Sequence, residues 1–282
     1  MRGVAAALTV LALAGCATTP PPAAPLTVDV AGRVPLSVGT GASRVTLTGV
    51  LAFPPRREAV PAVILMHGCS GVSANMRHWA EALRTWGYAT FILDSFGARG
   101  LKSVCETGSL RSDDRVVDAY AALGLMARHP RVDRTRVVLM GFSHGGGVVL
   151  LAGARWVARS HAGPERPAFR AFVAFYPRCE GRYPGALSGP LRVHIGSLDD
   201  WTPAPPCEVM VESLRGGGAD ARITVYEGAR HGFDSVTLPP ERWLPNVQGP
   251  RGRRGASIGH SPDAAARARD NVKRELGELL GG

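Results

Sequence analysis

The feature that most constrains the fold is an alternation along the chain. Short apolar, β-branched runs alternate with segments in which apolar residues recur every three or four positions. The runs at residues 60–66 and 137–140 are continuously apolar, as in strands of a parallel sheet that is covered on both faces. Strands are predicted at 44–53, 60–66, 88–93, 137–140, 169–175, 191–195 and 223–226, and helices at 74–86, 112–128, after Ser143, at 206–214 and at 264–280. The alternation predicts one doubly wound α/β domain, with a mostly parallel sheet and helices on both faces.

The N-terminus has the pattern of an export signal. Arg2 precedes an apolar stretch at 4–14, which ends in a Leu-Ala-Gly-Cys sequence at Cys16. This sequence resembles the lipobox of bacterial lipoproteins, in which the signal is cut before the cysteine and the thiol is lipidated. The alternative is an ordinary secretory signal that happens to contain a cysteine. We predict a signal peptide at 1–15, a lipidated Cys16 with a proline-rich tether at 16–30, and one domain at 31–282.

The predicted location follows from this signal. Because Ala17, rather than an aspartate, follows the cysteine, resemblance to known sorting rules favours the periplasmic face of the outer membrane. The membrane partner would then be reached through the lipid anchor alone, since no later apolar run has the length of a spanning helix.

Composition excludes other classes of protein. The chain is 45% hydrophobic and 20% charged, which is typical of globular proteins. Its formal net charge of +10 comes almost entirely from arginine, and no nucleic-acid-binding module accompanies it. We therefore expect no nucleic-acid partner. The Pro-, Gly- and Arg-rich stretch at 239–259 is interpreted as a solvated loop, with contact to anionic lipid as the alternative.

The pattern G-x-S-x-G occurs twice, at 141–145 and 255–259. The first copy follows the apolar run at 137–140 and leads into a helical segment, which is the setting of a nucleophile elbow with Ser143 at the turn. The second copy, around Ser257, has no predicted strand before it and no helix directly after it. Ser143 is therefore the candidate nucleophile.

A serine nucleophile needs a base and an orienting carboxylate, which in this setting follow it in the order Ser, acid, His. The histidines downstream of Ser143 are His161, His194, His231 and His260. His194 falls inside a predicted strand and should be structural. His231 follows the last strand, at the sheet edge where ligands bind, so it is the predicted base. After the strand at 191–195, either Asp199 or Asp200 could be the acid.

These motifs together resemble the dienelactone hydrolase family of α/β hydrolases, over about residues 45–280. The resemblance rests on His67–Gly71 (HGCSG), Asp94–Gly97 (DSFG), Arg99-Gly100, Gly141–Gly146, Phe175–Pro177 (FYP), Asp199–Pro203 and His231–Phe233 (HGF). It implies the α/β-hydrolase fold. The family's namesake has a cysteine where this chain has Ser143, and a glutamate where it has Gly68, so the resemblance implies a serine esterase branch.

The resemblance also implies an assignment of the acid. In this family the acid is the fourth residue of a G-x-x-D-x-x-x-P stretch, which Gly196 and Pro203 delimit here. The acid is then Asp199, with Asp200 as the second choice.

The remaining candidate residues concern the substrate and the oxyanion. Two backbone N–H groups should form the oxyanion hole, those of His144 and of Cys69 in the loop after residues 60–66. Arg99 either binds a substrate carboxylate or forms an ion pair within its loop. Trp201 either lines the acyl pocket or packs beneath the acid loop.

We therefore expect a serine hydrolase that cleaves small-molecule carboxylic esters through an acyl-enzyme, with Ser143, Asp199 and His231 as its triad. No cofactor and no metal are expected. The alternatives are a peptidase or acyltransferase on the same triad, and a non-catalytic envelope-binding lipoprotein of the same fold. The sequence leaves the oligomeric state and the acyl size open.

Four cysteines remain in the predicted domain: Cys69, Cys105, Cys179 and Cys207. An even number in an exported chain indicates disulfides, with buried free thiols as the alternative. Cys179 and Cys207 follow strands that should be neighbours, and Cys69 and Cys105 lie in loops at the same sheet edge. We predict these two pairs.

Overall fold

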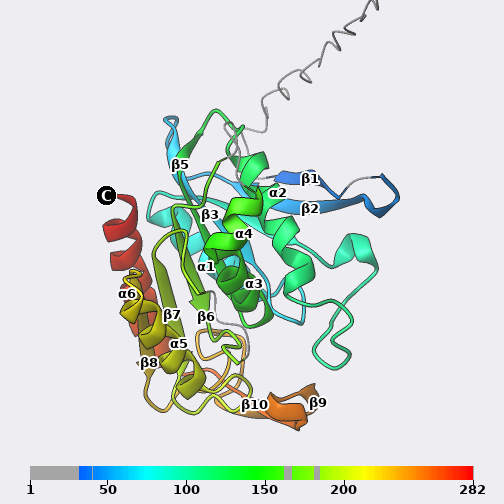
Figure 1. Ribbon diagram of the computed structural model, residues 1–282, viewed down its shortest axis with the longest axis vertical. Helices are drawn as coiled ribbons and strands as arrows, with labels where there is room; N and C mark the ends of the chain where they lie inside the picture. Colours follow the sequence, from blue (N-terminus) through cyan, green and yellow to red (C-terminus); the bar gives the residue numbers. More distant parts are fainter. Residues whose placement is uncertain (1–31, 40, 162–166, 181–184, 282) are drawn as a thin grey trace, which may run out of the picture.

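The computed structural model describes residues 32–39, 41–161, 167–180 and 185–281 (Figure 1). The predicted signal peptide, Cys16 and the tether lie outside the described residues. Within the described ranges, no helix combines the length and the apolar character needed to cross a bilayer.

An eight-stranded sheet forms the centre of the fold, in the order β1-β2-β4-β3-β5-β6-β7-β8. Its strands are β1 (Gly32–Val38), β2 (Val45–Ala52), β3 (Val60–Met66), β4 (Ala89–Asp94), β5 (Val132–Phe142), β6 (Ala171–Phe175), β7 (Leu191–Gly196) and β8 (Ala221–Tyr226). Strands β3 to β8 pair in parallel, whereas β1 pairs with β2, and β2 with β4, in antiparallel fashion. The predicted mostly parallel sheet is confirmed.

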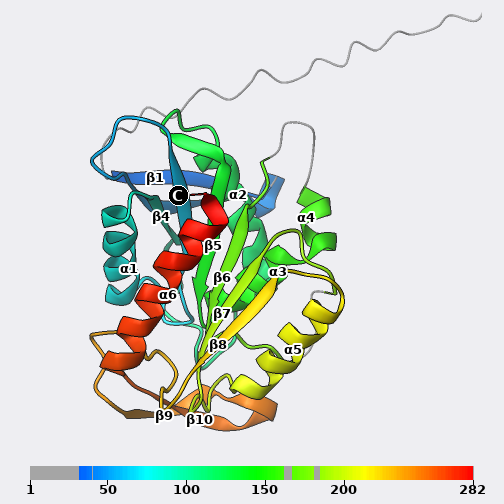
Figure 2. The same ribbon diagram turned by 90° about the vertical axis from the view of Figure 1, so that its left-hand side faces the viewer.

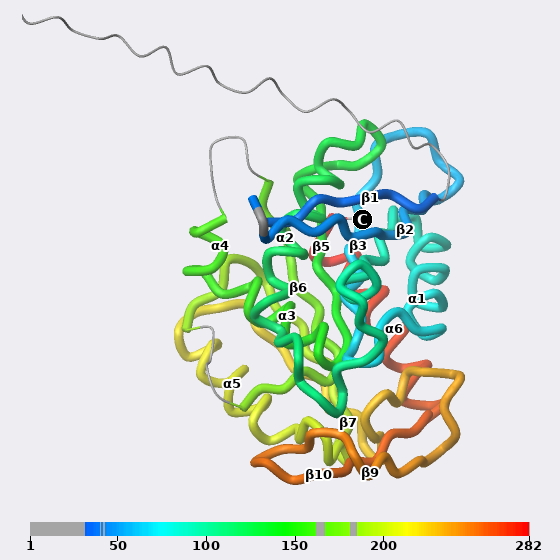
Figure 3. Tube along the Cα trace, turned by 90° about the vertical axis from the view of Figure 1, so that its right-hand side faces the viewer, coloured from blue at the N-terminus to red at the C-terminus, as the bar shows by residue number. Residues whose placement is uncertain are grey.

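Helices cover both faces of this sheet (Figures 2 and 3). Helices α1 (Ala74–Thr85) and α6 (Pro262–Leu280) lie on one face, and α2 (Val116–Met126), α3 (His144–Gly153), α4 (Arg155–His161) and α5 (Ala204–Gly216) lie on the other. Short 3-10 turns occur at Gly41–Ser43, Gly97–Arg99, Asp113–Arg115 and Pro250–Gly252. Since the central strands are buried on both sides, their continuous apolar character is explained.

The sequence analysis missed strand β1. It alternates buried residues Val34, Leu36 and Val38 with exposed ones, which is the period expected of a strand. Pro35 interrupts this pattern in the sequence. A proline is tolerated here because β1 is an edge strand and the missing N–H can face solvent.

The stretch at 239–259 is not the solvated loop that was predicted. It contains a two-stranded antiparallel hairpin of β9 (Arg242–Gln248) and β10 (Arg254–Ile258), at the end of the molecule opposite the start of β1 (Figure 1). The sequence analysis predicted no strand at the G-x-S-x-G motif of 255–259, whereas β10 begins at Arg254 and runs through it to Ile258. Ser257 lies inside β10, only 6% exposed, rather than at a turn between a strand and a helix.

Candidate active site

Ser143 sits at the sharp turn between β5 and α3. Its backbone has φ 53° and ψ −114°, a conformation that L-residues rarely adopt, and its N–H donates to Phe175 O at 2.9 Å. A Cβ on Gly141 would lie 2.3 Å from Gly145 O, and one on Gly145 would lie 2.2 Å from Met66 O. The two glycines of the motif therefore allow the elbow to close and to contact the end of β3.

The three predicted triad residues, which come from separate loops, lie together in the structure. Ser143 Oγ is 2.9 Å from His231 Nε2, and His231 Nδ1 is 2.8 Å from Asp199 Oδ2. His231 and Asp199 are each 4% exposed. The other carboxylate oxygen of Asp199 accepts the N–H groups of Trp201 at 3.0 Å and Thr202 at 2.8 Å. The carboxylate is thus held in place on both sides.

Two further side chains, which the sequence analysis missed, complete this arrangement. Thr202 Oγ1 lies 3.1 Å from both Asp199 Oδ2 and His231 Nδ1, and it donates to Tyr176 O at 3.0 Å. The Tyr176 ring packs 4.6 Å from the imidazole of His231. Tyr176 has a positive φ of 36°, so its backbone is strained directly after β6. Thr202 could have been found as the third residue after the acid, but nothing in the local sequence marks Tyr176 as strained.

The Trp201 side chain is packed against other residues and does not line an open pocket. It is 8% exposed, its ring centroid is 4.8 Å from that of His231, and its Nε1 donates to Gln248 O at 2.9 Å. Its indole therefore lies between the imidazole and the β9–β10 hairpin.

Asp200, the second choice for the acid, bonds the hairpin, whereas Asp199 bonds the imidazole. Its side chain accepts the N–H of Ser257 at 2.7 Å, in strand β10. It therefore joins the acid loop to the hairpin, as a supporting residue of the loop.

The other downstream histidines have structural contacts. His194 is fully buried, and its Nδ1 lies 2.9 Å from the hydroxyl of Tyr226, as expected for a residue inside a strand. The His161 ring stacks on Tyr120, with centroids 4.1 Å apart. His260 contacts a backbone carbonyl at 2.9 Å.

Asp234, three residues after His231, is a buried anchor that the sequence analysis missed. It is 2% exposed and accepts three hydrogen bonds: from Tyr176 Oη at 2.8 Å, and from Asn75 Nδ2 and Trp79 Nε1, each at 2.7 Å. Burial, and next the charge of Asp234, hold the pKa of Tyr176 well above its usual value, so the phenol stays a donor. Asp234 thus links α1 to the strained residue beneath the imidazole.

We expect Asp234→Ala to lower the free energy of unfolding by about 3 kcal/mol or more, because three buried donors lose their acceptor. Denaturant unfolding followed by circular dichroism measures this change. Asp270→Ala, at an exposed position of α6, is the matched control, with an expected change within about 0.5 kcal/mol. Equal stability of the two variants would contradict the anchoring role.

The predicted cysteine pairs are those that the structure contains. Cys69 is joined to Cys105, and Cys179 to Cys207. Cys69 O also accepts the N–H of Val104 at 2.8 Å, so the loop that carries Cys69 is tied twice to the segment that follows β4.

We expect the double variants Cys69→Ala/Cys105→Ala and Cys179→Ala/Cys207→Ala each to lose about 3 kcal/mol of stability, because each bond restricts the unfolded chain. Only the first pair should also lower kcat by about tenfold or more, since it positions the Cys69 N–H group. Thermal unfolding and ester hydrolysis of the purified variants test this difference. Equal kcat values for the two variants would refute a special role for the first disulfide.

Arg99 forms an ion pair with Asp118, which is one of the two roles considered for it. Its guanidinium donates to both oxygens of Asp118, at 2.8 and 2.9 Å, and to Ser95 O at 2.6 Å. Asp118 is fully buried. The buried carboxylate of Asp118 therefore occupies the two-pronged N–H edge with which this guanidinium would hold a substrate carboxylate.

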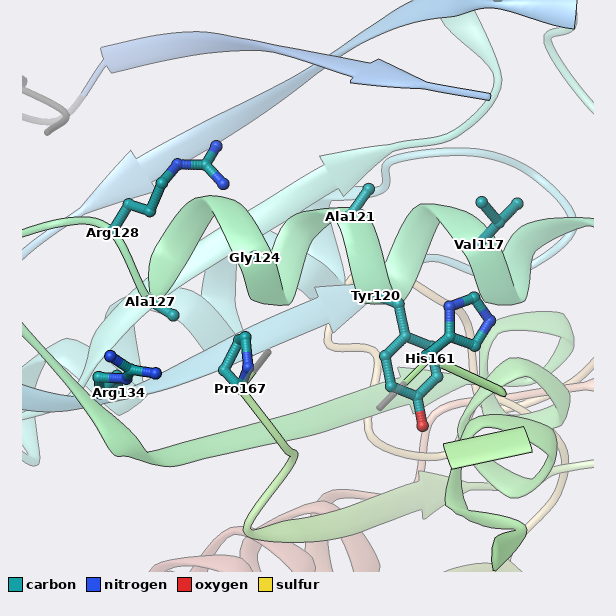
Figure 4. A pocket seen from close by; sticks show the side chains of 9 residues that line it. All are labelled: Val117, Tyr120, Ala121, Gly124, Ala127, Arg128, Arg134, His161 and Pro167. Atoms are coloured by element: carbon teal, nitrogen blue, oxygen red, sulfur yellow. The ribbon is translucent and has the colours of Figure 1, made fainter. Parts of the chain in front are cut away.

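Two hollows lie along helices α2 and α3. A cavity of about 440 Å³ runs along α2, where Figure 4 shows the Tyr120 and His161 rings against each other, with Arg134 and Pro167 further along. A larger hollow of about 840 Å³ lies along α3 and is lined by Ser112 and Gly147, among others. None of the triad residues lines either hollow. Among the residues that the structure describes, no group of three or more His, Cys, Asp or Glu side chains could hold a metal ion.

Comparison with known proteins identifies relatives. A curated protein of Bradyrhizobium sp., named "Probable 2-oxo-3-(5-oxofuran-2-ylidene)propanoate lactonase", is 25% identical over 218 residues, which is 70% of this chain and 82% of the relative. A dienelactone hydrolase-like promiscuous phosphotriesterase from metagenomic libraries has a similar fold, with a TM-score of 0.66 and 19% identity over 89% of this chain and 99% of the other.

An esterase from the Planctomycetes species Thermogutta terrifontis, solved with bound propionate, also has a similar fold. Its TM-score is 0.64, at 18% identity, over 90% of this chain and 95% of the other. The family described as "Dienelactone hydrolase family" matches residues 47–278. The chain therefore belongs to the dienelactone hydrolase family and is a hydrolase of ester bonds.

Proposed function

We propose that this protein is a serine esterase that hydrolyses small-molecule carboxylic esters through a covalent acyl-enzyme. The observation that carries the proposal is the chain of contacts from Ser143 Oγ to His231 Nε2, at 2.9 Å, and from His231 Nδ1 to Asp199 Oδ2, at 2.8 Å. Its order and geometry are those that turn a serine hydroxyl into a nucleophile.

In the first half of the reaction, Ser143 Oγ forms a bond to the acyl carbon while its proton moves to His231 Nε2. The resulting imidazolium is stabilised by Asp199 and returns the proton to the leaving alkoxide as the bond between the carbonyl carbon and the ester oxygen breaks. In the second half, the oxygen of a water molecule bonds to the acyl carbon while His231 takes its proton. The bond between the acyl carbon and Ser143 Oγ then breaks, His231 returns the proton to Oγ, and the acid product leaves. No cofactor takes part in this sequence.

The carbonyl oxygen carries negative charge in both tetrahedral intermediates, and we propose that the N–H groups of His144 and Cys69 stabilise it. His144 is the first residue of α3, so its N–H has no acceptor within the helix and points along the positive end of the helix dipole. The close approach of Gly145 to Met66 O supports a common site, because it brings the elbow against the loop that carries Cys69.

Labelling with a fluorophosphonate, followed by peptide mapping, tests the proposal. We expect one phosphonate on the peptide that contains Ser143, together with hydrolysis of short p-nitrophenyl esters. A panel of peptides and of acyl acceptors, assayed with the same preparation, separates an esterase from a peptidase or acyltransferase. Absence of labelling and of turnover would instead favour a non-catalytic binding protein.

For its location, we propose export and lipid anchoring through Cys16 at the periplasmic face of the outer membrane. The lipobox-like sequence before Cys16 motivates this proposal, and the two disulfides are of the kind that forms in oxidising compartments. The full chain should incorporate radiolabelled palmitate and fractionate with outer membranes, whereas Cys16→Ser should not be labelled. Equal labelling of both would refute the anchor.

A further inference from the structure

Arg115 is a buried cation directly behind the proposed oxyanion hole. It precedes α2, and its side chain is fully buried. Its Nη1 donates to His67 O at 2.9 Å and contacts His144 Nδ1 at 2.8 Å, while its guanidinium lies 5.0 Å from the centre of the Phe96 ring. These contacts link two segments, because His67 lies two residues before Cys69 and His144 follows the nucleophile.

Among the described residues, no acid contacts this guanidinium directly, and its Nε and Nη2 atoms have no hydrogen-bond partner. Asp118, three residues further along the chain, is engaged by Arg99. Burial lowers the pKa of Arg115 to about 9, against the partial compensation of Asp118, so the group is still charged at neutral pH. An unpaired buried charge opposes folding, so a purely structural role does not account for it.

Arg115 also determines the state of the two neighbouring histidines. Since it donates to His144 Nδ1, the proton of that ring is on Nε2, which donates to Leu110 O at 3.0 Å. Burial and then the charge of Arg115 lower the pKa of His144 to about 4, and the same two causes hold the pKa of His67 well below its usual value. With both imidazoles neutral, Arg115 is the charged side chain that contacts both of these segments.

We infer that Arg115 is a positioning residue of the oxyanion hole. It joins the Cys69 loop to the elbow and adds positive potential where negative charge develops on the carbonyl oxygen. Preorganised charge in a site without water acts strongly on such a transition state and needs no rearrangement during the reaction. The inference rests on the proposed esterase function and deepens it.

The test compares Arg115→Met with Arg192→Met. Arg192 is a matched control, because it is 2% exposed and ion-paired to Asp220, near the start of β7 and away from the triad. Both variants should unfold at lower temperature than the wild type. For short p-nitrophenyl esters, Arg115→Met should lower kcat about 10- to 100-fold with KM within about threefold, whereas Arg192→Met should keep kcat within about twofold.

Arg115→Lys keeps the positive charge but changes the shape of the side chain, so it separates the effect of charge from that of packing. It also provides the kinetic comparison if Arg115→Met does not fold. We expect the lysine variant to keep kcat within about fivefold of the wild type. A folded Arg115→Met with wild-type kcat, or a folded Arg115→Lys with a loss of 10-fold or more, would overturn the inference. Ser143→Ala, assayed alongside, reports on the proposed function itself: activity that persists in Ser143→Ala refutes the esterase mechanism, whatever the arginine variants do.

Discussion

Ser143→Ala should abolish fluorophosphonate labelling and lower kcat for ester hydrolysis by roughly 10⁶-fold, as loss of the nucleophile does in other serine hydrolases. The expected loss is this large because nothing replaces the attacking oxygen: the base, the acid and the oxyanion N–H groups remain, but no acyl-enzyme can form. The fold should be retained, because the substitution removes one hydroxyl and its hydrogen bond to His231 and leaves the backbone bond from the Ser143 N–H to Phe175 O in place. Circular dichroism of the purified variant verifies that point.

Ser257→Ala is the control for this experiment. Ser257 belongs to the second G-x-S-x-G sequence and is contacted through its backbone N–H by Asp200, which the substitution leaves in place. Labelling and kcat should therefore match those of the wild type. Labelling that survives in Ser143→Ala and disappears in Ser257→Ala would transfer the nucleophile to the hairpin.

Asp199→Asn is expected to lower kcat by about 10³- to 10⁴-fold, with a smaller effect on KM. The reason is the proton on His231. The carboxylate oxygen 2.8 Å from Nδ1 accepts only, which keeps the proton there and leaves Nε2 free to take the proton of Ser143. An amide can turn its NH₂ group toward Nδ1 and so stabilise the opposite tautomer. Steady-state kinetics over a range of pH measure the loss.

Asp200→Asn is the matched change one residue further along. An asparagine oxygen can still accept the N–H of Ser257, so kcat should stay within about threefold of the wild type. A larger loss in Asp200→Asn than in Asp199→Asn would move the acid by one residue.

The sequence was sufficient for the parts of the fold with the strongest periodicity. The predicted strand at 60–66 has the bounds of β3, and the other predicted strands overlap β2 and β4 to β8. The central strands β3, β4 and β6 are buried along almost their whole length, so their residue types are almost all apolar. Strands β1 and β9 were missed because they are largely exposed on one face or both, and Pro35 and Pro245 break their pattern. Strand β10 is short, and Gly255 breaks its pattern.

A similar division applies to the site. The structure brings together Ser143, His231 and Asp199, the three residues whose positions follow from strand ends and loop motifs. Asp234 and Arg115 were not found, because their partners are distant in sequence. Asp234 bonds residues more than 150 positions earlier, and Arg115 contacts His67 and His144, which follow β3 and β5. Such contacts depend on the packing of side chains in three dimensions, and one sequence carries no signal for them.

The β9–β10 hairpin gives the active site a local stability of its own. Gln248, at the end of β9, makes four of the contacts that join the hairpin to its neighbours. Its carbonyl oxygen accepts hydrogen bonds from the side chains of Trp201 and Arg178. Its backbone N–H donates to Cys105 O, and its side-chain Nε2 donates to Glu106 O. The small apolar cluster under the hairpin consists of Trp201, Val247, Ala256 and Ile258, and it is separate from the main core.

Segments with few buried contacts open at a lower free energy than the core does. When this hairpin opens, the acid loop and the disulfide-bonded loop lose a shared brace at the same moment, while the eight-stranded sheet remains intact. We therefore expect catalytic activity to be lost under milder conditions than the global fold. Heat or denaturant should first produce a folded but inactive state, whose exchange of backbone hydrogens is fast in residues 242–258 and slow in β3, β5 and β6.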